Sequence, residues 1–376
     1  MVQKIPWRVA AIMVAALLAL SGAYALRLER QKVDGWEINI WRADPRPKEP
    51  RKADPRNKFP GFAEIFAADR LAQRRSQGSW DTMVHSLAYD ENHHRLIVGR
   101  ETGEIDIWNL AGSSKLATAK AEDGFRAENL AFDADGQRFF AAVLGRRRGI
   151  NLWDAATGRL LHAFPEFSGR VFYTGLEDLY LMSNYYELYF FDTHLFRTTP
   201  IPGNHDEWAE VLAVDEKKAV AAAYMNGSLG LYRISAEGER PALEKLGESV
   251  PYKVEDGIGL AYFDPEGENL YLVLNRPGRL VQWSAPGLEK IKTTPLGFEV
   301  VTQAKVSPDK KLLALCGLFE KPDPSGWRYV VKLMELSSGR NAVESTNSTA
   351  IAIEFVPDLN ALLAVHGNAT TVFELP

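Results

Sequence analysis

One short pattern recurs seven times along the chain, and it constrains the fold more than any other feature of the sequence. Its clearest copy is GINLWDAATGRLL, residues 149–161, in which an apolar run ends at Trp153 and is followed by a Thr-Gly turn. Alignment on this copy places one large apolar residue in each repeat, and successive residues of this set are 38 to 51 positions apart. They are Trp108, Trp153, Phe191, Tyr232, Trp283, Met334 and Phe373. A regular spacing of this size indicates one structural unit repeated seven times.

A second pattern lies upstream of each copy and has the same period. Two apolar runs flank a polar turn, as in LAFDADGQRFFAAV from Leu130 and AKVSPDKKLLALC from Ala304. Two antiparallel strands joined by a tight turn have this pattern. The hairpin supplies strands a and b of each unit, the first pattern supplies strand c, and units one to six continue into a strand d. We therefore predict an all-β, seven-bladed β-propeller with four-stranded antiparallel blades over residues 80–376.

The seventh unit ends at Pro376, directly after its strand c. An incomplete blade would leave a row of unpaired backbone amides, which natural sheets avoid. One segment outside the repeats alternates like a strand: GWEINIW, residues 35–41. We predict that it closes the ring as the outermost strand of blade seven.

The first 26 residues are typical of a targeting segment. Lys4 and Arg8 precede an uncharged run from Val9 to Leu26, and residues 23–25 read Ala-Tyr-Ala, a signal-peptidase pattern. The run is long for a signal peptide and slightly short for a membrane-spanning helix of about 20 residues. A cleaved signal peptide and an N-terminal hydrophobic helix that anchors the protein through residues 9–26 both remain open. Either way, we expect residues 27–376 to be extracytoplasmic, in the periplasm or secreted.

Two further segments separate the closing strand from the propeller. Residues 42–60 contain five prolines and seven Lys or Arg residues, so this part of the 27–60 segment is predicted to be an extended basic linker. Residues 61–75 carry a mostly apolar stripe at helical spacing. We predict a short amphipathic helix within residues 61–78.

Residues 80–376 resemble the WD40 and WD40-like propellers through VSPDKKLLAL, AFDADGQRFFAA and LWDAATGRLL. Among the strand-c tryptophans only Trp153 is followed by Asp, and the Gly-His pairs of that family are missing, so we expect its hydrogen-bonded tetrad to be absent. The chain is more similar to divergent, exported bacterial propellers of the quinoprotein type. That likeness implies a protein-interaction subunit, or alternatively a cofactor-dependent oxidoreductase chain or a hydrolase of the quinoprotein or lactonase type.

Composition narrows the function further. A net charge of −5 and a pI near 5.9 give no basic field, so we expect no nucleic-acid partner. The motifs HExxH, GxSxG and the phosphate-binding loop are missing from the sequence. The single cysteine, Cys316, lies in an apolar run and is expected to be buried, and the adjacent His93 and His94 fall in a turn. We expect no cofactor and favour a non-enzymatic binding protein, with an enzyme left open.

Propeller geometry indicates where a partner would bind. The loops from strand d to the next strand a, and from strand b to strand c, share one face, which we call the top face. Several of these loops carry aromatic, Arg or acidic residues, and aromatic and Arg side chains are frequent at interface hot spots. We predict a protein partner, for example in an envelope or redox complex, bound through Trp80, Asp81, Arg126, Arg146, Arg147, Arg148, Tyr185, Tyr186, Glu207, Trp208, Asp256, Trp327 and Arg328.

Overall fold

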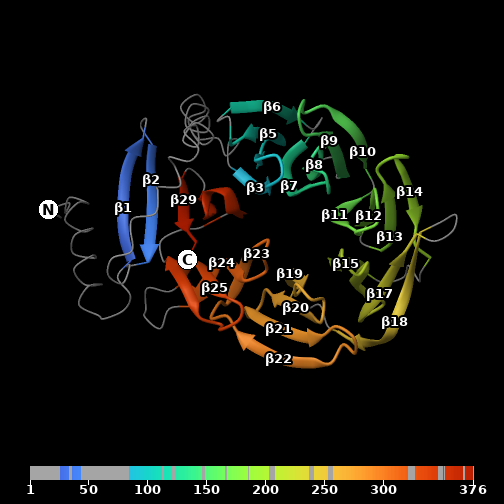
Figure 1. The fold of residues 1–376 in the computed structure, drawn as a ribbon. Coiled ribbons are helices and arrows are strands. Elements are labelled where there is room, and N and C mark those ends of the chain that lie inside the picture. The colour runs from blue at the N-terminus through green and yellow to red at the C-terminus, as the bar shows by residue number, and fades with distance from the viewer. Residues whose placement is uncertain are drawn as a thin grey trace.

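The computed structural model describes residues 26–33, 36–43 and, with short internal gaps, 84–375. The described residues form seven β-sheets arranged radially around a central axis, so the fold is a seven-bladed β-propeller (Figure 1). In each blade strand a lies nearest the axis, and the later strands follow outward.

Blades one to six are four-stranded antiparallel sheets in which neighbours in sequence are neighbours in space. Blades one and two contain β3 (Val84–Asp90), β4 (Arg95–Arg100), β5 (Glu104–Asn109), β6 (Ser114–Lys120), β7 (Gly124–Phe132), β8 (Arg138–Gly145), β9 (Gly149–Asp154) and β10 (Leu160–Phe164). Blades three and four contain β11 (Ser168–Tyr173), β12 (Leu179–Ser183), β13 (Leu188–Asp192), β14 (Arg197–Pro200), β15 (Ala209–Asp215), β16 (Val220–Met225), β17 (Ser228–Ser235) and β18 (Ala242–Pro251). Blades five and six contain β19 (Ile258–Phe263), β20 (Asn269–Leu274), β21 (Arg279–Ser284), β22 (Lys290–Pro295), β23 (Val300–Val306), β24 (Leu312–Glu320), β25 (Trp327–Glu335) and β26 (Asn341–Ser345).

The seven repeated strand-c residues are all buried, from Trp108 in blade one to Phe373 in blade seven. Each packs in a cluster with residues of the preceding blade: Trp153 contacts the cluster of Ile105 and Ile107 from blade one, and Trp283 that of Leu229 from blade four. Burial of one such side chain contributes about 1.5–3 kcal/mol. The repeated residue is therefore the contact between adjacent blades.

The three tryptophans of this set, Trp108, Trp153 and Trp283, bury their indole N–H groups without a hydrogen-bond partner in the part of the chain that the structure describes. They stabilise the blade interfaces mainly by apolar packing, and Lys115 Nζ lies 6.0 Å from the ring centroid of Trp108. The buried thiol of Cys316 is likewise a small core side chain, and it donates a 3.2 Å hydrogen bond to the Ala350 carbonyl.

The a–b turns share one capping device. At the end of strand a, a short polar side chain accepts a hydrogen bond from a backbone N–H inside the turn, as Asp264 does from Glu268 at 2.8 Å and Ser307 from Leu312 at 2.9 Å. Such local bonds are why Asp, Ser and Thr favour turns. The capping residues of blades one to six are Asp90, Asp133, Thr174, Asp215, Asp264 and Ser307.

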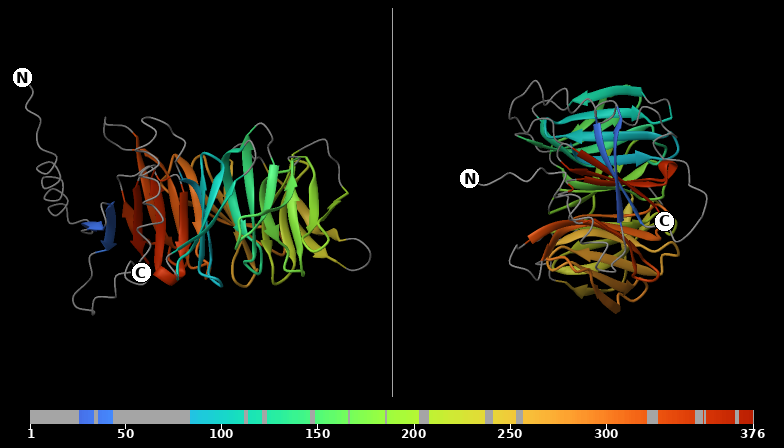
Figure 2. Two further views of the ribbon diagram at one scale, coloured as in Figure 1. Left: turned by 90° about the horizontal axis from the view of Figure 1, so that it is seen from above. Right: turned by 90° about the vertical axis from the view of Figure 1, so that its left-hand side faces the viewer.

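The seventh blade combines both ends of the chain. Its C-terminal part is β27 (Ala352–Val356), a 3-10 turn at Pro357–Leu359, β28 (Ala361–His366) and β29 (Ala369–Glu374). An N-terminal hairpin of β1 (Leu26–Val33) and β2 (Trp36–Ala43) completes it at the edge of the ring (Figure 2). Strand β2 pairs with β29 over Asn39–Thr371 to Trp41–Phe373.

Our placement of the closing strand needs correction. The segment expected as the outermost strand is β2, but β1 lies outside it, so the blade has five strands in the order β1-β2-β29-β28-β27. The pairing of β2 with β29 is parallel rather than antiparallel. No tight turn joins these two strands, so neither direction is imposed by the connection.

The two predicted helices are a second correction to the fold class. The described residues form strands, turns and one 3-10 turn, with no α-helix. Leu26, expected as the end of a hydrophobic helix, instead begins β1, because Leu-Arg-Leu-Glu alternates and its backbone pairs with β2. The rest of the 1–26 segment and all of 61–78 lie outside the described residues. Within those residues, no helix is long and apolar enough to cross a membrane.

We predict that ring closure depends on β2 and much less on β1. Deletion of residues 36–43 exposes the edge of β29, so the melting temperature should fall sharply in a thermal unfolding experiment. Deletion of residues 26–33 leaves the β2–β29 pairing intact and serves as the matched control. Equal melting temperatures for the two deletions would show that β2 does not close the ring.

Candidate functional site

The central channel widens into a polar cavity at the top face. Strand a of each blade runs away from this face, so its first residues surround the channel mouth. The cavity has a volume of about 720 Å³ and is lined by residues of six strands a, β3, β7, β11, β19, β23 and β27, with a few from neighbouring loops and strands. Ligand pockets typically measure about 300–1,000 Å³. The mouth is therefore large enough for a small molecule or the end of a peptide.

Three side-chain pairs surround this cavity, and two of them are ion pairs. Arg126 pairs with Glu128 on β7, and His85 on β3 contacts Glu101. Burial lowers the pKa of His85, although Glu101 opposes the shift, so the ring is neutral at pH 7. The third pair, Lys305 with Glu354, joins two blades.

Lys305 on β23 donates to Glu354 on β27, with 2.7 Å between Nζ and Oε2. Burial raises the pKa of the Glu354 carboxyl, and the Lys305 ammonium counteracts part of this rise. The pair links blades six and seven directly beside the cavity, so removal of one partner would leave a buried charge uncompensated.

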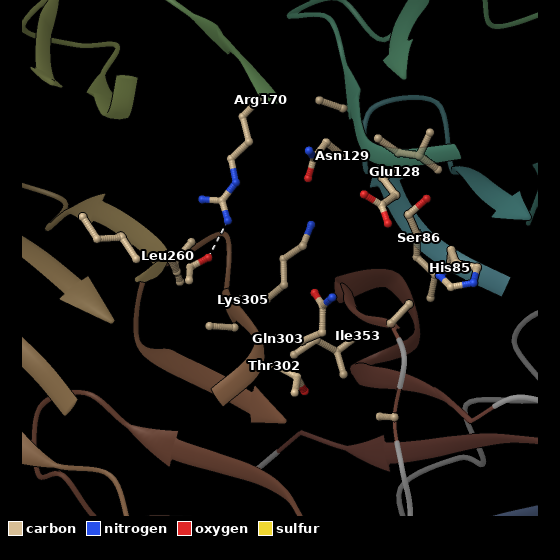
Figure 3. Close-up of a pocket in the computed structure, with 18 of the residues that line it drawn as sticks. His85, Ser86, Glu128, Asn129, Arg170, Leu260, Thr302, Gln303, Lys305 and Ile353 are labelled. Carbon is tan, nitrogen blue, oxygen red and sulfur yellow. Dashed lines mark hydrogen bonds between the residues drawn. The ribbon is translucent and has the colours of Figure 1, made fainter. Parts of the chain in front are cut away.

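Arg170 differs from these paired groups. It extends from β11 across the channel mouth and donates a hydrogen bond to the Gly259 carbonyl on β19, two blades away (Figure 3). Glu210 on β15 interacts with Arg170 electrostatically. Its carboxylate also accepts a 3.3 Å hydrogen bond from the indole N–H of Trp208. Arg170 therefore connects blades three, four and five.

Uncharged polar side chains complete the cavity wall. The amides of Asn129 and Gln303 lie on opposite sides of the space into which Arg170 and Lys305 extend (Figure 3). Asn129 sits at a bulge of β7 with φ 49°, a left-handed conformation that Asn tolerates better than most residues. Its side chain donates to the Gly169 carbonyl at 3.3 Å, which fixes the amide beside Arg170.

A second depression lies on the top face between blades three and four. It has a volume of about 600 Å³, and its lining includes Tyr186, Ile201, Met225 and Lys245. Tyr186 is 58% exposed there. Trp208, which precedes the lining residue Ala209 in the sequence, is 45% exposed. We call this depression the lateral groove.

Of the thirteen predicted contact residues, the structure describes three with their side chains. Arg126 lines the channel mouth and Tyr186 lines the lateral groove, whereas Trp208 is exposed and donates to Glu210. Trp327 and Arg328 begin β25, where only the backbone is described. The remaining eight lie outside the described residues: Trp80, Asp81, Arg146, Arg147, Arg148, Tyr185, Glu207 and Asp256.

Sequence reasoning missed the polar residues inside the strands. We searched the loops, whereas Arg170, Gln303 and Lys305 lie within strands a. A signal was present, because polar residues at alternate positions of an inner strand, such as Gln303 and Lys305, share one face. In a propeller that face can be directed into the channel.

The described residues contain no group of three or more His, Cys, Asp or Glu side chains arranged to hold a metal ion. In comparisons with known proteins, no protein-family model matches the chain, and no curated protein matches its sequence. The geometry of the top face therefore carries the functional argument.

We predict that Lys305→Met makes stability depend on pH through Glu354. The folded-state pKa of Glu354 is raised above its ordinary value of 4.5, so its stabilising effect is full below that value and is lost as pH rises through the folded pKa. At pH 8 the free energy of unfolding of the variant should be lower by about 2 kcal/mol, which is a smaller loss than for a fully buried pair. At pH 5 the loss should be smaller still. Urea unfolding at both pH values measures this loss.

The double variant Lys305→Met/Glu354→Gln is the control, because it removes the titrating group. Its loss of stability should not grow between pH 5 and pH 8. A Lys305→Met variant that also shows no added loss at pH 8 would contradict this role of the pair.

Proposed function

We propose that this protein is an exported, WD40-like propeller that acts as a non-enzymatic interaction module and binds a protein partner on its top face. The observation that carries the proposal is the pair of exposed aromatic residues Tyr186, in the lateral groove, and Trp208, on a ring whose other large side chains are mostly buried. The wide polar channel mouth lies on the same face.

The groove has the composition of an interface centre. Tyr and Trp give large contact areas with few rotatable bonds, and they are enriched among the residues that dominate binding energy. Trp208 is also held in place, because its indole N–H donates to the carboxylate of Glu210. A side chain that is already ordered loses less entropy when a partner covers it. The aromatic composition and the ordered indole both support a role for these side chains in binding a protein surface.

The polar mouth supports the same function. Its ion pairs are formed between side chains of the propeller itself, as in Arg126–Glu128 and Lys305–Glu354. Fixed charges of both signs around an opening favour a partner with a complementary pattern and disfavour others. The top face would thus combine an aromatic contact area with a charged, selective centre.

We propose export from the targeting pattern in residues 1–26. Alkaline phosphatase, which is active only outside the bacterial cytoplasm, is fused after residue 376 and expressed in a bacterium. We expect activity from the full chain and none after deletion of residues 1–25. Equal activity from the two fusions, or none from the full chain, would contradict export.

The top-face proposal predicts that Tyr186→Ala/Trp208→Ala abolishes partner capture. The full chain is used as bait in detergent-solubilised envelopes, and recovered proteins are identified by mass spectrometry. The control is Leu195→Ala, which truncates a side chain that is 64% exposed in the c–d turn on the opposite face. We expect the wild type and the control to recover the same partner, and the double variant to lose it. Equal recovery by all three would exclude the lateral groove as the contact.

A further inference from the structure

We propose that the mouth of the central channel binds a carboxylate group and that Arg170 recognises it. The inference rests on the function proposed above, because it names the chemistry that a partner would present to the centre of the top face. The carboxylate can belong to a chain end or to an acidic side chain.

The first argument is the state of the Arg170 guanidinium. This group has five N–H donors. Among the described residues, its one hydrogen bond goes to the neutral carbonyl of Gly259, and Glu210 acts on it through space. By contrast, Arg126 and Lys305 each form an ion pair with a carboxylate at the same mouth. Among the described cations at this mouth, Arg170 is the one without a hydrogen-bonded carboxylate partner.

The second argument is the free-energy cost of holding the Arg170 guanidinium partly buried with one hydrogen bond to a carbonyl. Surrounding protein lowers the pKa of Arg170, with Glu210 opposing the shift, but a guanidinium stays charged at any physiological pH. A half-buried charge bonded to a single carbonyl is incompletely compensated. A carboxylate restores the balance, because its two oxygens match two parallel N–H groups of the guanidinium.

The third argument is the surrounding polar set. The Asn129 amide, the Gln303 amide and the Lys305 ammonium lie around the same space as the Arg170 guanidinium (Figure 3). Lys305 adds a second positive charge, and the amides can donate to the oxygens that Arg170 leaves free. The donors thus converge from three walls of the cavity.

The neighbouring acids select among anions. Glu128, Glu210 and Glu354 all lie close to these cations, as their hydrogen bonds and electrostatic interactions show. Because three acids accompany the three cations Arg126, Arg170 and Lys305, the site has little net charge with which to favour a doubly charged phosphate. A planar carboxylate, whose two oxygens match the guanidinium, is therefore the anion that this mixed site fits.

The test uses the full-length protein and four probes followed by isothermal titration calorimetry. N-acetyl-alanyl-alanine presents a chain-end carboxylate, and N-acetyl-aspartate N-methylamide presents a side-chain carboxylate. N-acetyl-alanyl-alanine amide is the neutral control, and inorganic phosphate is the dianion control. We expect saturable binding of at least one carboxylate probe, with little binding of the amide and weaker binding of phosphate. The preferred carboxylate probe identifies the source.

Two substitutions test the residue. Arg170→Gln should weaken binding of the preferred probe at least tenfold, and Arg170→Lys should give an intermediate loss because it keeps the charge without the planar fork. The matched control is Arg233→Gln on the outer strands, where the arginine is exposed and pairs with Glu244. Far-UV circular dichroism confirms folding, and if Arg170→Gln fails to fold, Arg170→Lys decides.

The proposal is overturned if neither carboxylate probe binds, if the amide or phosphate binds as tightly, or if the Arg170 variants bind like the wild type. These outcomes are separable from failure of the proposed function. Loss of probe binding with intact groove-dependent capture removes only the carboxylate site. If the probe binds through Arg170 but partner capture does not depend on Tyr186 and Trp208, only the proposed partner contact at the lateral groove is excluded.

Discussion

The fold depends on one repeated contact, in which the large strand-c residue of each blade packs against the blade before it. Phe191 lies in a cluster with Phe140 of blade two, Phe373 with Val331 of blade six, and Trp108 with Leu363 of blade seven. The last of these closes the circle, since blade one packs on blade seven as every other blade packs on its predecessor. Seven apolar contacts between adjacent blades thus close the ring, and the β2–β29 ladder joins the N-terminal hairpin to the last strand.

Much of this was predictable because blade packing demands a large apolar residue at one fixed point of each repeat. Trp153 and Met334 occupy equivalent places although they share only size and apolarity. The outer edge obeys no such rule: β1 pairs through its backbone, and its sequence alternates only in part. The helix prediction failed at Leu26 for a related reason, because the apolar content near this residue does not distinguish a helix from a short strand.

The channel mouth was less predictable, because its function depends on which strand faces which across the axis. Arg170 in SGRVFY looks like an ordinary polar residue of an outer strand, and nothing local to β11 indicates that Gly259 and Glu210 lie opposite. Loops could be assigned to the top face from connectivity alone, as for Tyr186 and Trp208. Placement across the channel requires the number of blades and the register of each inner strand.

The same rigid ring explains why a charged centre is possible there. Since the blade interfaces provide the stability, the strands a are free to carry polar groups where they meet at the axis, and the pair of Lys305 with Glu354 shows that most of these groups are compensated within the protein. Arg170 is the exception, a guanidinium spanning three blades with a carbonyl as its hydrogen-bond acceptor. Apolar packing holds the ring, so the desolvation of Arg170 is a cost to folding that an anion arriving from outside would offset.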